Sequence, residues 1–229
     1  MINAFPATGE CGGLRLPRFT LGITTLAIAL YALFGPAPEL WVFDRVAIAQ
    51  GEWWRLVSGH LVHSDFEHAF WDILAFALIG ALVEQSGSGR TRAAAAISLL
   101  MVDAWLWWGA GYLRWYCGLS GIINTLLVLL IDQLWREEKS VWVALGAAGY
   151  GIKLLVEAVT GNALLTATAW PSVVSVHLVG VAVAVVFLIF RGSGNWKTGS
   201  ENNFHYGRAA YRKNGVREQK TLIFEKIVL

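Results

Sequence analysis

Six long apolar segments constrain what this chain can fold into. They cover residues 19–35, 66–83, 93–112, 118–135, 140–160 and 171–190. Each is close to the roughly 20 residues that an α-helix needs to cross the hydrocarbon core of a bilayer. Only 15% of the residues are charged, whereas soluble domains average about 25%. The sequence therefore predicts an all-α membrane protein with six transmembrane helices.

The stretch between the first two segments, Gly35 to Asp65, differs from both a membrane span and a solvated linker. It is too amphipathic to cross a bilayer and too aromatic to be surrounded by water, and Trp41, Trp53 and Trp54 lie within it. Tryptophan is enriched at the membrane–water interface. We expect this stretch to form an interfacial loop between helices 1 and 2.

The distribution of basic residues predicts the orientation. After Phe190 the tail holds eight Lys/Arg and three Asp/Glu, although the whole chain has a net charge of only +2. The connections on the same side as this tail carry most of the remaining basic residues, namely Arg15, Arg18, Arg90, Arg92, Arg136 and Lys139. Positively charged loops face the cytoplasm, so both termini are expected there, and the basic tail is interpreted as a topology signal and not as a nucleic-acid site.

Three regions follow from this division. Residues 1–18 form a cytoplasmic N-terminal segment without the features of a cleaved signal peptide. Residues 19–190 form the six-helix domain, and residues 191–229 form a basic flexible cytoplasmic tail. Cys11 and Cys117 would lie on opposite sides of the membrane and are not expected to form a disulfide.

Ser120 is the first candidate for chemistry. It lies in "GLSG", between Gly118 and Gly121, where the fourth apolar segment begins. About fourteen residues separate Gly118 from Asp132, or roughly 20 Å of helix against a core of about 30 Å. The helix would thus begin below the membrane surface, where its free N–H groups could stabilise an oxyanion. The alternative is that these small residues only allow close helix packing.

A serine nucleophile needs a general base. His177 lies about six residues past Pro171 in the sixth segment, and an ionisable side chain at such depth is a functional candidate. Gly180 and Ala184 share its helix face and would allow the close approach of a neighbouring helix. No acid lies near His177 in the sequence, so a Ser–His dyad is predicted. A packing histidine is the alternative.

A second group of polar residues precedes and enters the second segment: His60, His63, His68 and Asp72. His68 and Asp72 are four residues apart and share a helix face. The spacing of the histidines does not suit a zinc site, and the HExxH motif is absent. We expect neither a metal nor any other cofactor.

Three motifs in this order resemble the rhomboid family of intramembrane serine proteases. "WWRLVSGHLVHSDFEHAFWD" is similar to the family's loop-to-second-helix signature, "GLSG" to its nucleophile motif, and "VHLVGVAVA" to its sixth-helix motif. The small size, "GHLVH" and "KLLVE" are most like the rhombosortase subgroup. That subgroup is associated with removing C-terminal GlyGly-type sorting tags from exported proteins of Gram-negative bacteria.

The resemblance implies a role for each matched residue. Ser120 would be the nucleophile and His177 the base, while His68 and the Ser120 backbone N–H would bind the oxyanion. Trp54, Arg55 and His63 would brace the interfacial loop. The expected substrate is a membrane-anchored protein with a C-terminal or single transmembrane segment, cleaved near the periplasmic side of a bacterial inner membrane.

Asp72 departs from the family pattern, which has Asn at this position in most members. A carboxylate accepts hydrogen bonds but cannot donate them to an oxyanion unless it is protonated. Asp72 could be protonated, could pair with His68 and keep that ring charged, or could mark an inactive protein that binds or escorts membrane clients. A small transporter is a more distant alternative. Lys153 and Glu157 are expected to form an ion pair or to contact substrate.

Overall fold

The computed structural model of the protein describes residues 15–164 and 168–193. The predicted segments 1–18 and 191–229 lie largely outside the described residues, as does Cys11. The described part is mostly helical, as predicted, and its six longest helices overlap the six apolar segments, although α5 begins at Ser88 and ends at Ala104 where the predicted segment covers 93–112. These helices are α1 (Arg18–Phe34), α4 (Phe66–Gln85), α5 (Ser88–Ala104), α6 (Ser120–Glu138), α7 (Val141–Thr160) and α8 (Val174–Ser193).

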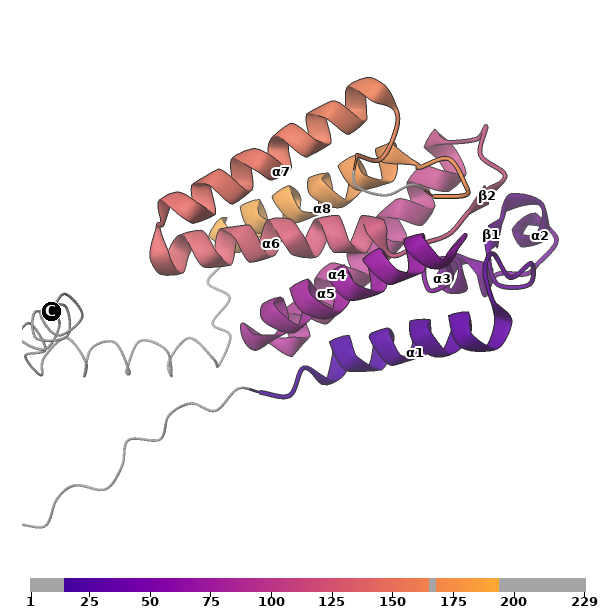
Figure 1. Ribbon diagram of the computed structural model, residues 1–229, viewed down its shortest axis with the longest axis horizontal. Helices are drawn as coiled ribbons and strands as arrows, with labels where there is room; N and C mark the ends of the chain where they lie inside the picture. Colours follow the sequence, from indigo (N-terminus) through magenta and orange to yellow (C-terminus); the bar gives the residue numbers. More distant parts are fainter. Residues whose placement is uncertain (1–14, 165–167, 194–229) are drawn as a thin grey trace, which may run out of the picture. The chain divides into compact units, whose positions relative to one another are not determined.

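Helix α6 is the central element of this bundle (Figure 1). It packs against α4, α5, α7 and α8, whereas α1 packs mainly against α4. Because neighbours surround it, α6 buries Leu126 and Leu129 almost completely, together with Phe76 of α4 and Ala184 of α8. A chemical group at the start of α6 is therefore within reach of several helices.

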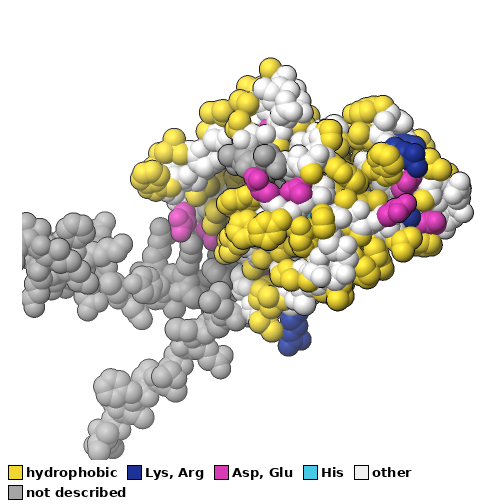
Figure 2. Space-filling view, turned by 45° about the vertical axis from the view of Figure 1, so that its right-hand side comes forward, with side chains coloured by type: hydrophobic (Ala, Val, Ile, Leu, Met, Phe, Trp, Pro, Cys, Tyr) yellow, Lys and Arg dark blue, Asp and Glu magenta, His cyan; other side chains and the backbone are white. Residues whose placement is uncertain are grey.

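Apolar side chains cover much of the face that Figure 2 shows. Leu78, Leu155 and Ile189, on three different helices, are each more than half exposed. Among the described residues, α4 and α7 are long and apolar enough to cross a membrane, and the apolar parts of α1 and α8 are shorter.

The predicted interfacial loop contains three short elements between α1 and α4. They are β1 (Phe43–Asp44), α2 (Arg45–Ala49) and α3 (Arg55–Ser58). Strand β1 pairs antiparallel with β2 (Trp115–Tyr116), so that Phe43 lies opposite Tyr116. The all-α prediction missed this small sheet because its two strands have only two residues each and are distant in the sequence.

Arg55 holds the 35–65 segment together from inside. Its guanidinium donates hydrogen bonds to the carbonyl oxygens of Glu39 and Val42 and forms an ion pair with Glu52. Trp54 is half exposed, and its indole N–H donates to the carbonyl oxygen of Leu40. Both side chains thus connect the residues just before β1 to the start of α3.

Candidate active site

Ser120 is the first residue of α6, directly after a tightly constrained turn. Gly118 has a φ of +119°, a backbone conformation that favours glycine. Its N–H donates to the carbonyl oxygen of Gly59, and its own carbonyl accepts from the Tyr116 hydroxyl. A Cβ atom at Gly118 would lie 2.6 Å from His68 Nε2. The glycine is therefore what allows this turn to lie directly on His68.

Arg45 and a π-helix, η1 (Trp105–Gly109), position the segment that leads to this turn. The Arg45 guanidinium donates to the carbonyl oxygens of Trp107, Ala110 and Leu113, and also to that of Leu106. One side chain thus satisfies the carbonyl groups that the end of η1 leaves unpaired.

The carboxylate of Asp72 lies beneath the same turn. Its Oδ2 accepts a hydrogen bond of 2.9 Å from the Leu119 backbone N–H. The same oxygen is 3.4 Å from His68 Nε2 and 3.7 Å from His63 Nε2. The structure thus brings His63, His68 and Asp72 together beside the backbone of Leu119. Asp72 acts here as an acceptor.

Asp65 supports this cluster from the start of α4. Its carboxylate accepts from the backbone N–H groups of His68 and Ala169 and from the Ser64 hydroxyl. Burial alone would raise the pKa of Asp65, but these three hydrogen bonds to the charged form hold it below the usual value. The contact with Ala169 ties the connection before α8 to the helix that carries His68.

Helices α6 and α8 are in backbone contact beside Ser120. A Cβ atom at Gly180 would lie 2.2 Å from the Gly121 carbonyl oxygen, and one at Gly121 would lie 2.8 Å from Val176 Cγ1. Thr125 adds a hydrogen bond of 2.8 Å to the Gly180 carbonyl. Gly121 follows Ser120 and Val176 precedes His177, so this contact brings together the helix turns that carry the two candidate residues.

His177 is buried and has an acidic neighbour that the sequence analysis did not find. Its Nδ1 is 3.0 Å from Oε2 of Glu157 on α7. The prediction of a dyad rested on the absence of an acid near His177 in the sequence, whereas the fold supplies one from another helix. Lys153 is also 2.9 Å from the Glu157 carboxylate, as the i, i+4 spacing predicted. The unusual charged pair in an apolar helix was the available signal.

His60 forms a second buried pair, with Asp103 of α5 at 3.2 Å. The ring of His60 also meets the ring of Tyr116 edge-on. In the described ranges 15–164 and 168–193, no group of three or more His, Cys, Asp or Glu side chains is arranged to hold a metal ion.

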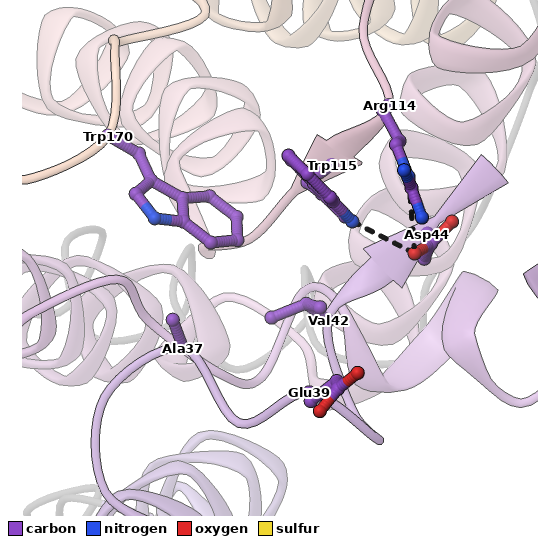
Figure 3. A pocket seen from close by; sticks show the side chains of 7 residues that line it. All are labelled: Ala37, Glu39, Val42, Asp44, Arg114, Trp115 and Trp170. Atoms are coloured by element: carbon purple, nitrogen blue, oxygen red, sulfur yellow. Dashed lines mark hydrogen bonds and ion pairs between the residues drawn. The ribbon is translucent and has the colours of Figure 1, made fainter. Parts of the chain in front are cut away.

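A cavity of about 300 Å³ opens beside β1 and β2 (Figure 3). Its walls include the indole rings of Trp115 and Trp170, whose centroids are 6.4 Å apart. Asp44 is held at its edge by the Trp115 indole N–H, at 2.9 Å, with Arg114 alongside at 3.7 Å. Val42 lines the cavity and also packs in one cluster with Cys117. The cavity therefore adjoins the segment that leads to Ser120.

Comparison with known proteins adds one match. The family model described as Rhomboid domain matches residues 50–193, which include Ser120, His177, His68 and Asp72. No curated protein sequence matches the chain.

Proposed function

Because the chain belongs to the rhomboid family, we propose that it is an intramembrane serine protease with Ser120 as nucleophile and His177 as general base. The observation that carries this proposal is the contact of Gly121 with Gly180 and Val176. It aligns the first turn of α6 with the turn of α8 that holds a buried histidine. Packing alone would not require a hydroxyl and an imidazole at this junction.

The proposed reaction is amide hydrolysis in two steps. Ser120 Oγ attacks the scissile carbonyl carbon, the carbonyl electron pair moves onto oxygen, and the Ser120 proton passes to His177 Nε2. His177 then gives this proton to the leaving amine as the C–N bond breaks. Water hydrolyses the acyl-enzyme by the same proton transfers. The His68 side chain and the Ser120 backbone N–H are the proposed oxyanion donors.

The membrane arrangement is part of the proposal. Helices α1, α4, α5, α6, α7 and α8 would each cross a bacterial inner membrane, with both termini in the cytoplasm. The 35–65 segment would lie at the periplasmic interface, braced by Trp54, Arg55 and His63. The positive-inside distribution of Lys and Arg supports this orientation.

We propose a membrane-anchored substrate with a C-terminal or single transmembrane segment, including the GlyGly-type tags that rhombosortases remove. The cavity beside Trp115 and Trp170 offers two indole faces to the periplasmic flank of such a substrate.

A second candidate is an inactive rhomboid-like protein that binds or escorts membrane clients. The observation that favours it is the hydrogen bond from the Leu119 N–H to Asp72. This contact places a carboxylate, which repels negative charge, beside the proposed oxyanion site. The Ser120 and His177 pair argues against this alternative.

The test is covalent labelling of the purified protein, in detergent, with a fluorophosphonate probe. The labelled residue is identified by mass spectrometry in the wild type and in the Ser120→Ala and His177→Ala variants. We expect labelling at Ser120 that is lost in both variants. A folded wild type that does not label, but still co-purifies with a GlyGly-tagged membrane reporter, would favour the escort function.

A further inference from the structure

Glu157 is a buried acid in a helix that is otherwise exposed. It is the only residue of α7 (Val141–Thr160) that is buried, and its exposed fraction is 1%. Taking a carboxylate out of water is costly unless it is paired and hydrogen-bonded. The few packing contacts of α7 do not account for this cost, so the partners of Glu157 must explain its place.

Three groups from three parts of the chain meet at this carboxylate. Oε2 faces Nδ1 of His177 on α8 at 3.0 Å, and Oε1 accepts from the Leu164 backbone N–H at 3.0 Å. Lys153, one turn earlier on α7, contacts it at 2.9 Å. Lys153 Nζ contacts both carboxylate oxygens and, with the Leu164 N–H, offsets the cost of burial, while Oε2 also faces the imidazole.

This arrangement selects one form of the His177 ring. A carboxylate accepts hydrogen bonds only, so the proton of the neutral ring lies on Nδ1, between the ring and Glu157. The lone pair is then on Nε2, the nitrogen that must take the proton of Ser120. The opposite tautomer would present an N–H to Ser120 and could not act as a base.

We propose that Glu157 is a positioning residue that completes a Ser120–His177–Glu157 triad. The inference rests on the proposed function and deepens it. Glu157 holds the ring in orientation and tautomer, and it stabilises the imidazolium that forms when the Ser120 proton reaches Nε2. The carboxylate itself keeps its charge throughout, and no proton passes to it.

The Glu157→Gln variant tests this role with almost no change of volume. The glutamine oxygen must serve the Leu164 N–H and Lys153, which turns its amide N–H group towards His177 Nδ1. A donor at Nδ1 forces the ring proton onto Nε2. The equivalent change of acid to amide costs about 10⁴ in rate in soluble serine proteases, and we expect labelling at Ser120 to fall about 10²–10⁴-fold.

Glu84→Gln is the matched control. Glu84 is also a buried glutamate, but it binds the backbone N–H groups of Phe19 and Thr20 at the opposite end of α4 from His68. Its change should leave the labelling rate of the folded protein within a few fold of wild type. Thermal melting of both variants in the same detergent reports how much folded protein each sample contains.

The pH dependence separates positioning from packing. We expect wild-type labelling to rise with pH and then reach a plateau, as catalysis by a general base predicts. In Glu157→Gln the remaining labelling should rise with pH without a plateau, because attack then depends on hydroxide or on ionised serine. A purely structural role would lower the amplitude and leave the profile unchanged.

The outcomes distinguish this inference from the function on which it rests. Wild type that labels together with Glu157→Gln that labels equally overturns the triad and leaves the protease intact. Wild type that does not label overturns both. If Glu157→Gln does not fold, NMR of the Ser120→Ala protein decides the matter. Its histidines are labelled with ¹⁵N, and the signals of His177 are assigned as those that a His177→Gln sample lacks. A neutral ring with its proton on Nδ1 supports the triad, and one with its proton on Nε2 overturns it.

Discussion

The carboxylate of Asp72 on α4 accepts a hydrogen bond from the backbone N–H of Leu119, the residue directly before Ser120, over 2.9 Å. Leu119 is only 1% exposed, so water cannot replace this acceptor. The contact fixes the turn that delivers Ser120 to the start of α6. Asp72 is therefore better described as the anchor of this turn than as a donor to the oxyanion.

Two substitutions test whether Asp72 matters for its hydrogen-bond-accepting oxygen or for its negative charge. Asp72→Asn keeps an oxygen for Leu119, and we expect labelling at Ser120 within about tenfold of wild type. Asp72→Leu leaves the buried N–H unpaired, which costs about 1–3 kcal/mol, and displaces the turn. Loss of one well-placed group at an oxyanion site costs about 10²–10³ in rate, and we expect a similar loss for Asp72→Leu.

Probe labelling and thermal melting of the two variants check this prediction. If Asp72→Asn lost as much labelling as Asp72→Leu, the charge would be the essential property. The interaction of Asp72 with His63 and His68 would then matter more than the hydrogen bond to Leu119.

The sequence was sufficient to predict the features that depend only on residues close together in the chain. Apolar runs located the six long helices, because a helix with a continuous apolar surface needs no information from distant residues. The position of "GLSG" at the start of the fourth apolar segment likewise placed Ser120 at the beginning of a helix, where α6 begins.

The contacts between helices could not be predicted from the sequence. Glu157 reaches His177 only because α7 and α8 lie side by side, and the spacing of twenty residues carries no periodic signal. The pairing of β1 with β2 likewise joins Phe43 to Tyr116, which are far apart in the sequence. Composition could mark Glu157 as costly in an apolar helix but could not identify its partner.

Gly118 is expected to tolerate no side chain. An added Cβ would lie 2.6 Å from His68 Nε2, and the φ of +119° is strained for any L-residue other than glycine. Such backbone strain costs about 1–3 kcal/mol. Gly118→Ala should lower the free energy of unfolding by this amount and reduce labelling at Ser120 at least tenfold.

Gly111→Ala is the control for Gly118→Ala. Gly111 lies in the same connection, but nothing is within 4 Å of its added Cβ. Its melting temperature and labelling rate should match those of the wild type. Equal loss in the two variants would show that the connection is sensitive to any alanine, and that the contact of Gly118 with His68 is not special.

Gly180 keeps α6 and α8 in contact. A Cβ atom there would lie 2.2 Å from the backbone oxygen of Gly121, which cannot move without shifting α6. Overpacking of this kind costs about 1–3 kcal/mol. We expect Gly180→Ala to melt at a lower temperature and to label slowly, because the turn of α6 that carries Ser120 is pushed away from the turn of α8 that carries His177.

Gly149→Ala provides the comparison, since its added Cβ on α7 meets open space. It should keep both the melting temperature and the labelling rate. A Gly180→Ala protein that melted and labelled like Gly149→Ala would contradict the close contact of α6 and α8.

Asp65 gives the fold a dependence on pH that can be predicted in sign. Although burial would raise its pKa, hydrogen bonds from His68, Ala169 and Ser64 hold the pKa of this carboxyl below its usual value. A carboxyl whose pKa is lower in the folded state stabilises that state above the unfolded pKa, about 3.9. This contribution is lost as the pH falls through the folded value. Asp65→Asn should therefore destabilise the protein at pH 7 by about 1 kcal/mol, because the amide nitrogen cannot accept from the Ala169 N–H and the negative charge at the start of α4 is lost. The difference from wild type should shrink below about pH 4. Thermal melting of both proteins in one detergent between pH 3 and pH 7 measures this difference in stability. A difference that stayed constant over the range would show that the charge of Asp65 is not what holds α4 to the connection before α8.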